Sequence, residues 1–263
     1  MSLAKILLLF LCATAAAQQS GFELIATFSI PEARQGVAVD SAGFYAIDNG
    51  QIGKYDKKTG RLLASWRGEP GGPILHLDSG VTADGKLVCA HSNYPGVPMT
   101  GSVEIWDAAT LQHLAGHSFG IAWGSCTWID RHDGFWWAGF AHYNKLREQT
   151  HTDNTWSTAV QFDDQWRMVQ AWIYPAALIE RFDGMSNSGG SWGPDGRLYL
   201  TGHDRGELYA VSLPRAGSIL VLNEIIPLAI QGQGIAWDRS EPGVLYAIQR
   251  EKREVRVFRG QFR

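Results

Sequence analysis

Three histidines stand at the ends of three short apolar segments of the chain. They are His91 in "VCAH", His142 in "GFAH" and His203 in "LTGH". Neutral imidazole binds zinc, copper, iron, nickel or manganese, and three protein ligands leave a coordination position open for water or substrate. The spacing therefore predicts one divalent metal ion as cofactor, held by His91, His142 and His203, with Asp78 or Gln249 as a further ligand.

Two other interpretations of these histidines stay open. His203 with Asp204, or His91 with Asp78, could move a proton near neutral pH. Alternatively, each imidazole only hydrogen-bonds the backbone of a loop. Neighbouring side chains on a strand point to opposite faces. We therefore expect Asp204 to cap the turn that follows the strand rather than to contact His203.

A substrate carboxylate could be held by Arg34, whose planar guanidinium matches a carboxylate. Taken together, the candidate catalytic residues are His91, His142, His203, Asp78 and Arg34.

The elements that carry these residues form a repeat. Five segments share a short strand ending in Asp, a turn and a second strand, beginning "QGVAVD", "SGVTAD", "SCTWID", "GSWGPD" and "QGIAWD". The anchoring residues are Asp40, Asp84, Asp130, Asp195 and Asp238, at intervals of 44, 46, 65 and 43. Third and fourth strands follow, rich in Val, Ile, Tyr and Trp. Four strands at this period are typical of a propeller blade.

The fifth repeat ends after three strands, at Arg263. The segment "FELIATFSIP" (22–31) precedes the first repeat and resembles the fourth strand "ILVLNEIIP" of the fourth. We therefore predict an all-β, five-bladed β-propeller in which the N-terminal strand completes the last blade and removes a free edge. The blades are expected at 34–67, 78–120, 124–175, 188–228 and 232–263 plus 22–31, and a solenoid or open sandwich is the alternative.

Loop lengths predict which face of the propeller functions. The turns between first and second strands are short, such as "DG" and "DSAG". Long segments occupy the other face, at 67–78, 92–101, 143–155 and 175–189. Long loops on a rigid scaffold usually carry binding and catalysis. We call this the top face and expect a polar central pocket there.

Aligned strand ends place further polar residues at this pocket. Second strands end at Asp48, His91, His142, His203 and Gln249, and other polar residues come just before first strands. The predicted substrate-binding residues are Gln35, His76, Asn187, Gln231, Gln233, Gln249, Tyr94 and Tyr143.

The N-terminal segment and the composition bound the cellular context. "MSLAKILLLFLCATAAA" has a short apolar run followed by small residues, which predicts a signal peptide cleaved near Ala17 and a secreted or periplasmic protein. No apolar run is long enough to span a bilayer. A net charge of −3 without a basic patch argues against a nucleic-acid partner. Cys89 and Cys126 could form one disulfide or remain two buried thiols. A monomer is expected.

The blade openings "RQGVAVD" and "GQGIAWD" resemble those of the plant-type glutaminyl cyclases. That resemblance implies a secreted five-bladed propeller of this length, whose reaction relies on the glutamate of a Glu-Gly-Leu element in the second blade. The matching place here reads "DSGV", with Ser79 before the glycine and Asp78 one residue earlier. The chain also resembles poorly characterised bacterial cycloisomerase-like and gluconolactonase-like propeller proteins.

These observations predict a lyase, hydrolase or isomerase that acts on a small polar or carbohydrate-derived substrate. The predicted metal ion could assist its reaction. The alternative is a non-catalytic propeller that binds carbohydrate, as a lectin does, or another protein. Five equivalent pockets between blades would favour a lectin, whereas one central site would favour an enzyme.

Overall fold

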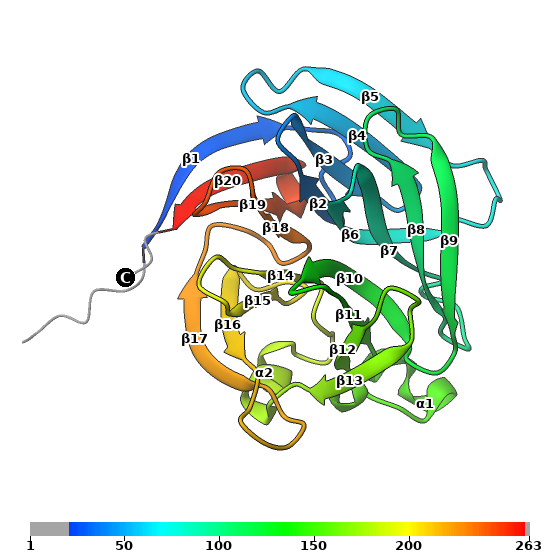
Figure 1. The fold of residues 1–263 in the computed structure, drawn as a ribbon. Helices are drawn as coiled ribbons and strands as arrows, with labels where there is room; N and C mark the ends of the chain where they lie inside the picture. The colour runs from blue at the N-terminus through cyan, green and yellow to red at the C-terminus, as the bar shows by residue number, and fades with distance from the viewer. Residues whose placement is uncertain (1–20, 261–263) are drawn as a thin grey trace, which may run out of the picture.

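The computed structural model describes residues 21–260, and the predicted signal peptide lies outside the described residues. Five four-stranded antiparallel sheets stand around a central axis as the blades of a propeller (Figure 1). The predicted all-β five-bladed fold is confirmed. None of the described helices is long and apolar enough to cross a membrane.

In blades 1 to 4 the strands run from the axis outward in chain order, and in blade 5 the outermost strand is β1. Blade 1 comprises β2 (Gly36–Val39), β3 (Gly43–Asp48), β4 (Gln51–Asp56) and β5 (Leu62–Arg67); blade 2 comprises β6 (His76–Ala83), β7 (Lys86–Ser92), β8 (Gly101–Asp107) and β9 (His113–Gly120). Blade 3 comprises β10 (Ser125–His132), β11 (Phe135–Ala141), β12 (Thr158–Phe162) and β13 (Met168–Ile173); blade 4 comprises β14 (Gly189–Trp192), β15 (Leu198–Thr201), β16 (Glu207–Ser212) and β17 (Val221–Pro227). Blade 5 comprises β18 (Ile235–Trp237), β19 (Val244–Gln249), β20 (Glu254–Gly260) and β1 (Phe22–Ser29). Short helices lie in the loops: η1 (Asn144–Leu146), α1 (Arg147–Thr150), η2 (Asn154–Trp156), α2 (Ala176–Arg181) and η3 (Arg250–Lys252).

The ring is closed by the two ends of the described chain. β1 pairs antiparallel with β20, from Phe22 opposite Gly260 to Ser29 opposite Glu254. This confirms that the N-terminal strand completes the last blade. Pairing with β1 also satisfies the backbone groups that β20 would otherwise expose as a sheet edge.

The inner strands are buried along most of their length, whereas burial alternates along the outer strands. Every residue of β2 and β3 is buried, because each blade packs on both faces against its neighbours. In the outer strand β5 only alternate residues are partly buried. Large aromatic side chains fill the spaces between blades, and Trp106, Trp128 and Trp137 are fully buried.

Glycines let the innermost strands approach one another at the axis. A Cβ atom on Gly36 would lie 2.4 Å from the backbone oxygen of Asp78 in the next blade. A Cβ atom on Gly234 would lie 2.7 Å from the Cα of Gly36. Such distances exclude any side chain, so the Gly in "QGVAVD" and "QGIAWD" is required for packing around the axis.

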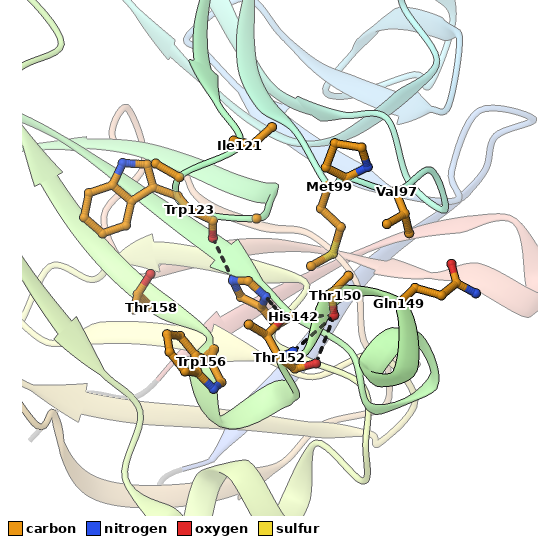
Figure 2. Close-up of a pocket in the computed structure, with 13 residues that line it drawn as sticks. Val97, Met99, Ile121, Trp123, His142, Gln149, Thr150, Thr152, Trp156 and Thr158 are labelled. Atoms are coloured by element: carbon orange, nitrogen blue, oxygen red, sulfur yellow. Dashed lines mark hydrogen bonds between the residues drawn. The ribbon is translucent and has the colours of Figure 1, made fainter.

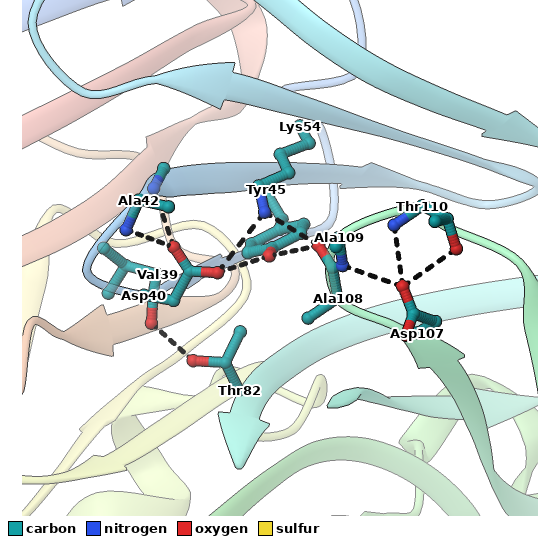
Figure 3. A network of polar contacts seen from close by, with 11 residues as sticks. Val39, Asp40, Ala42, Tyr45, Lys54, Thr82, Asp107, Ala108, Ala109 and Thr110 are labelled. Carbon is teal, nitrogen blue, oxygen red and sulfur yellow. Dashed lines mark hydrogen bonds and ion pairs between the residues drawn. The ribbon is translucent and has the colours of Figure 1, made fainter. Parts of the chain in front are cut away.

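Polar contacts tie neighbouring blades together on the face opposite the long loops (Figure 3). The buried ammonium of Lys54 donates to the Ala108 carbonyl at 2.8 Å and lies 3.5 Å from Asp40 Oδ2. The Tyr45 hydroxyl contacts the same carbonyl at 2.7 Å, and Thr82 Oγ1 donates to the Val39 carbonyl at 2.7 Å. These contacts fix blade 1 against blade 2.

Asp130 ties three blades on the same face. Its Oδ2 accepts the backbone N–H of Trp192 in blade 4 at 2.7 Å, and its Oδ1 accepts from Arg239 Nη2 in blade 5 at 2.8 Å. The side chain is almost completely buried. Because a buried N–H that loses its acceptor is costly, this carboxylate is a strong local constraint.

Cys89 and Cys126 are both free and buried. Burial raises the pKa of each thiol. Both side chains belong to the apolar core, Cys89 between blades 1 and 2 and Cys126 between blades 2 and 3. Of the two alternatives left by the sequence, the structure shows buried thiols.

Candidate functional site

A polar cavity of about 390 Å³ opens at the centre of the top face. All five blades contribute to it, through second-to-third-strand loops and blade connections. The residues that line it are Arg34, Gln35, Asn49, Leu75, His76, Asp78, Tyr94, Pro95, Thr127, Tyr143, Lys145, Met185, Ser188, His203, Gln233 and Arg250. The long-loop face therefore carries a central pocket.

Two β-bulges place side chains at the floor of this pocket. In blade 2 the pairing shifts between Leu77 and Gly80, so β6 holds one extra residue beside β7. In blade 3 the pairing of β10 with β11 shifts in the same way between Cys126 and Trp128. Asp78 and Thr127 occupy the two bulges, and both line the pocket. A bulge re-aims the side chain that it carries, which here directs both residues toward the axis.

Asp78 is the buried acid of the pocket. Its exposed fraction is 4%, and burial raises its pKa well above the ordinary value of a carboxyl group. Its Oδ2 lies 3.5 Å from His76 Nε2. Burial lowers the pKa of His76 to about 4, with a further contribution from His91, so this imidazole is neutral at pH 7. No lysine or arginine of the described chain forms an ion pair with Asp78, which favours its uncharged form.

His203 stands at the rim between two charged partners. Its Nδ1 lies 2.7 Å from Asp204 Oδ1, and its Nε2 lies 2.8 Å from Arg250 Nη1. Arg250 can only donate, so Nε2 accepts and the proton of the neutral ring is on Nδ1. Burial lowers the pKa of His203; Asp204 acts in the opposite direction, whereas Arg250 and Lys145 lower it further.

The prediction that Asp204 caps its turn and does not contact His203 is wrong. β15 ends at Thr201, so His203 and Asp204 lie in a bend beyond the strand. The alternation of side chains in a strand does not extend to them, and the two side chains can meet.

Two tyrosines form one wall of the pocket. The rings of Tyr94 and Tyr143 lie 5.0 Å apart between centroids, and the Tyr94 ring lies 5.1 Å from that of His76. The ammonium of Lys145 lies 4.9 Å from the centroid of the Tyr94 ring. Burial raises the pKa of Tyr143, and the nearby Asp78 contributes in the same direction. This wall offers aromatic faces and a hydroxyl beside the buried acid.

His91 forms hydrogen bonds within the protein and does not line the central pocket. Its Nε2 accepts the backbone N–H of Leu75 at 2.9 Å, and its Nδ1 lies 2.8 Å from Ser102 Oγ. The buried ring therefore holds the connection between blades 1 and 2 against β8. Both ring nitrogens are engaged, and neither is free to bind a metal ion or substrate.

His142 lies in a second, off-axis pocket between blades 2 and 3 (Figure 2). Its Nδ1 lies 2.7 Å from Thr152 Oγ1, and its Nε2 donates to the Trp123 carbonyl at 3.2 Å. The ring thus joins two top-face loops. The pocket has a volume of about 460 Å³, and its walls include Ile121, Trp123 and Trp156.

The structure does not bring the three histidines together. They lie at three different places: inside a blade connection, in the off-axis pocket and at the rim of the central pocket. Within residues 21–260, no group of three or more His, Cys, Asp and Glu is placed to hold one metal ion. The predicted ligand set therefore does not fit a shared metal. The binding of one divalent metal ion by the protein stays a prediction, which elemental analysis would test.

The ten other predicted site residues have mixed placements. Arg34, Gln35, His76, Asp78, Tyr94, Tyr143 and Gln233 line the central pocket together with His203. Gln231 instead hydrogen-bonds Glu251 at 2.9 Å. Asn187 and Gln249 do not line the pocket; the Asn187 amide is fully buried, and neither of its polar atoms has a hydrogen-bond partner among the described residues.

Sequence reasoning missed several lining residues, above all Lys145 and Arg250. Each stands within three residues of a predicted strand end, in "HYNK" and "QR". The first lies in a loop marked by its length, and the second directly follows Gln249. The direction of their side chains depends on η1 and η3, which carry no repeated pattern.

A further cavity, of about 410 Å³, lies on the opposite face among the short turns. It is lined by Asp40, Thr82, Asp84 and Arg239, among others. Asp40 takes part in the blade ties described above. This cavity is built from turn residues, and it has no counterpart of the buried, unpaired Asp78.

No protein-family model matches the chain, and no curated protein matches it. Solved structures match it as folds. A Streptomyces coelicolor aldose sugar dehydrogenase, solved in its PQQ-bound form, aligns over 92% of this chain and 99% of its own, at 10% identity and a TM-score of 0.54. The WD40 propeller domain of Doa1 aligns over 91% of this chain and 97% of its own, at 12% identity and a TM-score of 0.46. The match to the aldose sugar dehydrogenase supports the propeller fold alone, and the resemblance to glutaminyl cyclases stays a prediction.

Proposed function

We propose that this propeller is an enzyme in which Asp78 transfers a proton to or from a small polar substrate in the central pocket. The observation that carries the proposal is the burial, at the floor of a polar cavity, of a carboxyl group that has no lysine or arginine partner in the described chain. A carboxyl group kept uncharged near neutral pH can donate a proton to a substrate oxygen, and its conjugate base can take a proton back. That chemistry serves a hydrolase, a lyase or an isomerase.

The surrounding residues suit this role. His76, with its lowered pKa, stays neutral beside Asp78 and does not stabilise a carboxylate by charge. Tyr94 and Tyr143 provide a wall against which a substrate ring can pack. A carbohydrate-derived substrate fits such a wall. In line with the predicted signal peptide, we propose that the enzyme acts outside the cytoplasm.

The rival function is that of a non-catalytic binding propeller, and propellers of known structure include both enzymes and interaction domains. The top face favours one specialised site over repeated lectin sites. The loop at 142–157 helps to form the off-axis pocket, whereas the corresponding loop of blade 1 is only Asn49 and Gly50. The blades therefore do not present equivalent pockets.

The test compares the wild type with Asp78→Asn and with the exposed control Asp195→Asn. A panel of lactones, glycosides, esters and 2-hydroxy acids is screened for turnover, and Asp78→Asn should lose at least about 100-fold of any activity found. Infrared difference spectra at pH 7 should show a protonated carboxyl band that disappears only in Asp78→Asn. Full activity of Asp78→Asn, or absence of that band from the wild type, would contradict the proposal.

A further inference from the structure

The central pocket gathers positive charge in a chain whose net charge is −3. Three of its lining residues are cationic, namely Arg34, Lys145 and Arg250. The only carboxyl group among the lining residues is Asp78, whose raised pKa favours the uncharged form. Even with Asp78 ionised, the lining residues carry more positive than negative charge at neutral pH.

Two of these cations have no carboxylate partner. Lys145 and Arg250 form no ion pair with any residue of the described chain. Arg250 gives one N–H to His203 Nε2, which leaves further donors on its guanidinium. The Lys145 ammonium lies 4.9 Å and 5.9 Å from the ring centroids of Tyr94 and Tyr143. Both cations also lower the pKa of His203, which shows that they act on the same rim.

Arg34 is only weakly compensated. Its Nε lies 4.0 Å from Asp48 Oδ1, whereas Asp48 Oδ2 lies 3.0 Å from Arg253 Nη1. The Asp48 carboxylate thus has a closer partner. The Arg34 guanidinium can therefore turn toward the pocket, because Asp48 keeps its ion pair with Arg253.

From this arrangement we infer that Lys145 and Arg250, assisted by Arg34, bind a compact anionic group of the substrate. The inference rests on the proposed function of the same pocket and narrows its substrate class to small molecules that carry a carboxylate or a phosphate. Cations that lack a protein partner in a partly buried cavity form strong charge-assisted hydrogen bonds with such a group. The anion would anchor the molecule at the rim and leave its neutral part between the tyrosines and Asp78.

Binding measurements by calorimetry at pH 7 test the inference with matched probes. Glucose is the neutral probe, glucuronate carries a carboxylate, and glucose 6-phosphate carries a phosphate; citrate and inorganic phosphate test the anions without a sugar. At least one charged probe should bind about tenfold or more tightly than glucose, and its affinity should fall as salt is added. The charged probe that binds best distinguishes the two anion classes.

Substitutions locate the binding. Lys145→Gln and Arg250→Gln should each weaken the charged probe by about 10- to 100-fold, because each removes a charged hydrogen bond. Lys145→Arg keeps the charge and should retain binding. The control is Lys252→Gln, which makes the same charge change on the exposed end of η3, next to Arg250, and should bind as the wild type does. Circular dichroism and thermal unfolding establish that each variant is folded.

Three outcomes would overturn the inference: glucose binding as tightly as the charged probes, equal losses in Lys252→Gln and Arg250→Gln, or no charged probe binding at millimolar concentration. Asp78→Asn separates this inference from the proposed function, because the substitution removes none of the three cations and should keep binding of the charged probe. If Asp78→Asn keeps its turnover while Arg250→Gln loses binding, the anion site stands and the proton-transfer role fails. If Asp78→Asn loses turnover while Arg250→Gln binds normally, the reverse holds.

Discussion

Arg250 Nη1 lies 2.8 Å from His203 Nε2 and joins the top loops of blades 5 and 4 at the rim of the pocket. The contact settles the state of the imidazole. A guanidinium donates to a ring nitrogen only when that nitrogen carries no proton, and Asp204 Oδ1 accepts from the other nitrogen at 2.7 Å. His203 is therefore held neutral, with its proton on Nδ1, beside a cation that opposes a second proton.

Removing that cation should raise the pKa of His203. Burial remains the largest cause of the lowered pKa, so Arg250→Gln should bring the value only partly back toward the ordinary one of 6.5. Titration of the imidazole by NMR measures the change directly. Lys252→Gln, which alters a neighbouring charge outside the pocket, should leave the titration unchanged. A pKa that does not move in Arg250→Gln would contradict the role given to this contact.

Asp78→Asn should stabilise the folded protein at alkaline pH. The pKa of Asp78 is raised in the folded state, so the folded state binds more protons than the unfolded state between the two pKa values. Wild-type stability should therefore decrease as the pH rises through the folded-state pKa, and the Asn variant should lack that decrease. At pH 8 we expect a gain of about 1 to 2 kcal/mol in the free energy of unfolding, by urea denaturation.

The ionisation of Asp78 should also appear in the pH dependence of turnover. If Asp78 donates a proton, turnover should decrease as the pH rises through its folded-state pKa. A variant that is both more stable and inactive would separate a functional acid from a merely structural one. Equal stability of wild type and Asp78→Asn at pH 8 would mean that the buried acid is not a strained group.

His76 should make the protein sensitive to acid. Its pKa falls from 6.5 in the unfolded chain to about 4 in the fold, so the unfolded state takes up a proton first as the pH decreases. The contribution of His76 to the free energy of unfolding is fully present above pH 6.5. It decreases by about 3 kcal/mol in total as the pH falls from 6.5 to about 4. His76→Gln should flatten the dependence of the unfolding free energy between pH 7 and pH 4. His151→Gln, at an exposed position that does not line the central pocket, is the control and should leave that slope in place.

The sequence was sufficient to predict the repeat, the ring closure and the face that carries the central pocket, because these depend on patterns that recur in every blade. Strand alternation, the Asp-centred turns and the resemblance of 22–31 to a fourth strand are each carried by many residues. An exception at one position therefore does not change the prediction. The blade openings "QGVAVD" and "QGIAWD" each contain a glycine whose role the sequence does not explain. The structure gives the physical reason, which is the close approach of Gly36 and Gly234 to neighbouring backbone.

The details of the site could not be read from the repeat. Equivalent strand ends do not imply equivalent roles: His91 fixes a connection, His142 joins two loops and His203 reaches the pocket. The bulge that directs Asp78 toward the axis depends on one extra residue of register, which a pattern of period two does not specify. Lys145 and Arg250 reach the pocket through short helical turns that differ from blade to blade.

Asp130 and Asp195 occupy the same position of the repeat, yet they should differ in their contribution to stability. Asp130→Ala leaves the buried N–H of Trp192 without an acceptor and removes the partner of Arg239, so we expect a loss of about 3 kcal/mol or more. Asp195 contacts only Arg197 and Tyr199 of its own blade, and its side chain is more exposed than that of Asp130 (20% against 1%), so Asp195→Ala should cost about 1 kcal/mol or less. Urea denaturation of both variants measures the difference. Similar losses would show that the tie across blades is not a special constraint.

Ring closure by β1 can be tested by removing the strand and supplying it again. A chain beginning at Pro31 lacks the partner of β20, so the edge of blade 5 is exposed and Phe28 no longer packs against Phe44, 5.0 Å away between ring centroids. We expect this chain to aggregate or to unfold at least about 10 °C below a chain that begins at Gly21.

A synthetic peptide of residues 21–31 should restore cooperative unfolding when it is added to the shorter chain. The same peptide with Ala26→Pro should fail, because Ala26 pairs with Val257 and proline would disturb the ladder there. Rescue by both peptides would point to non-specific burial of apolar surface, whereas rescue by the native peptide alone would place β1 in the register observed. Equal unfolding temperatures for the two chains would mean that four of the blades and a three-stranded fifth are sufficient, and that β1 does not hold the ring closed.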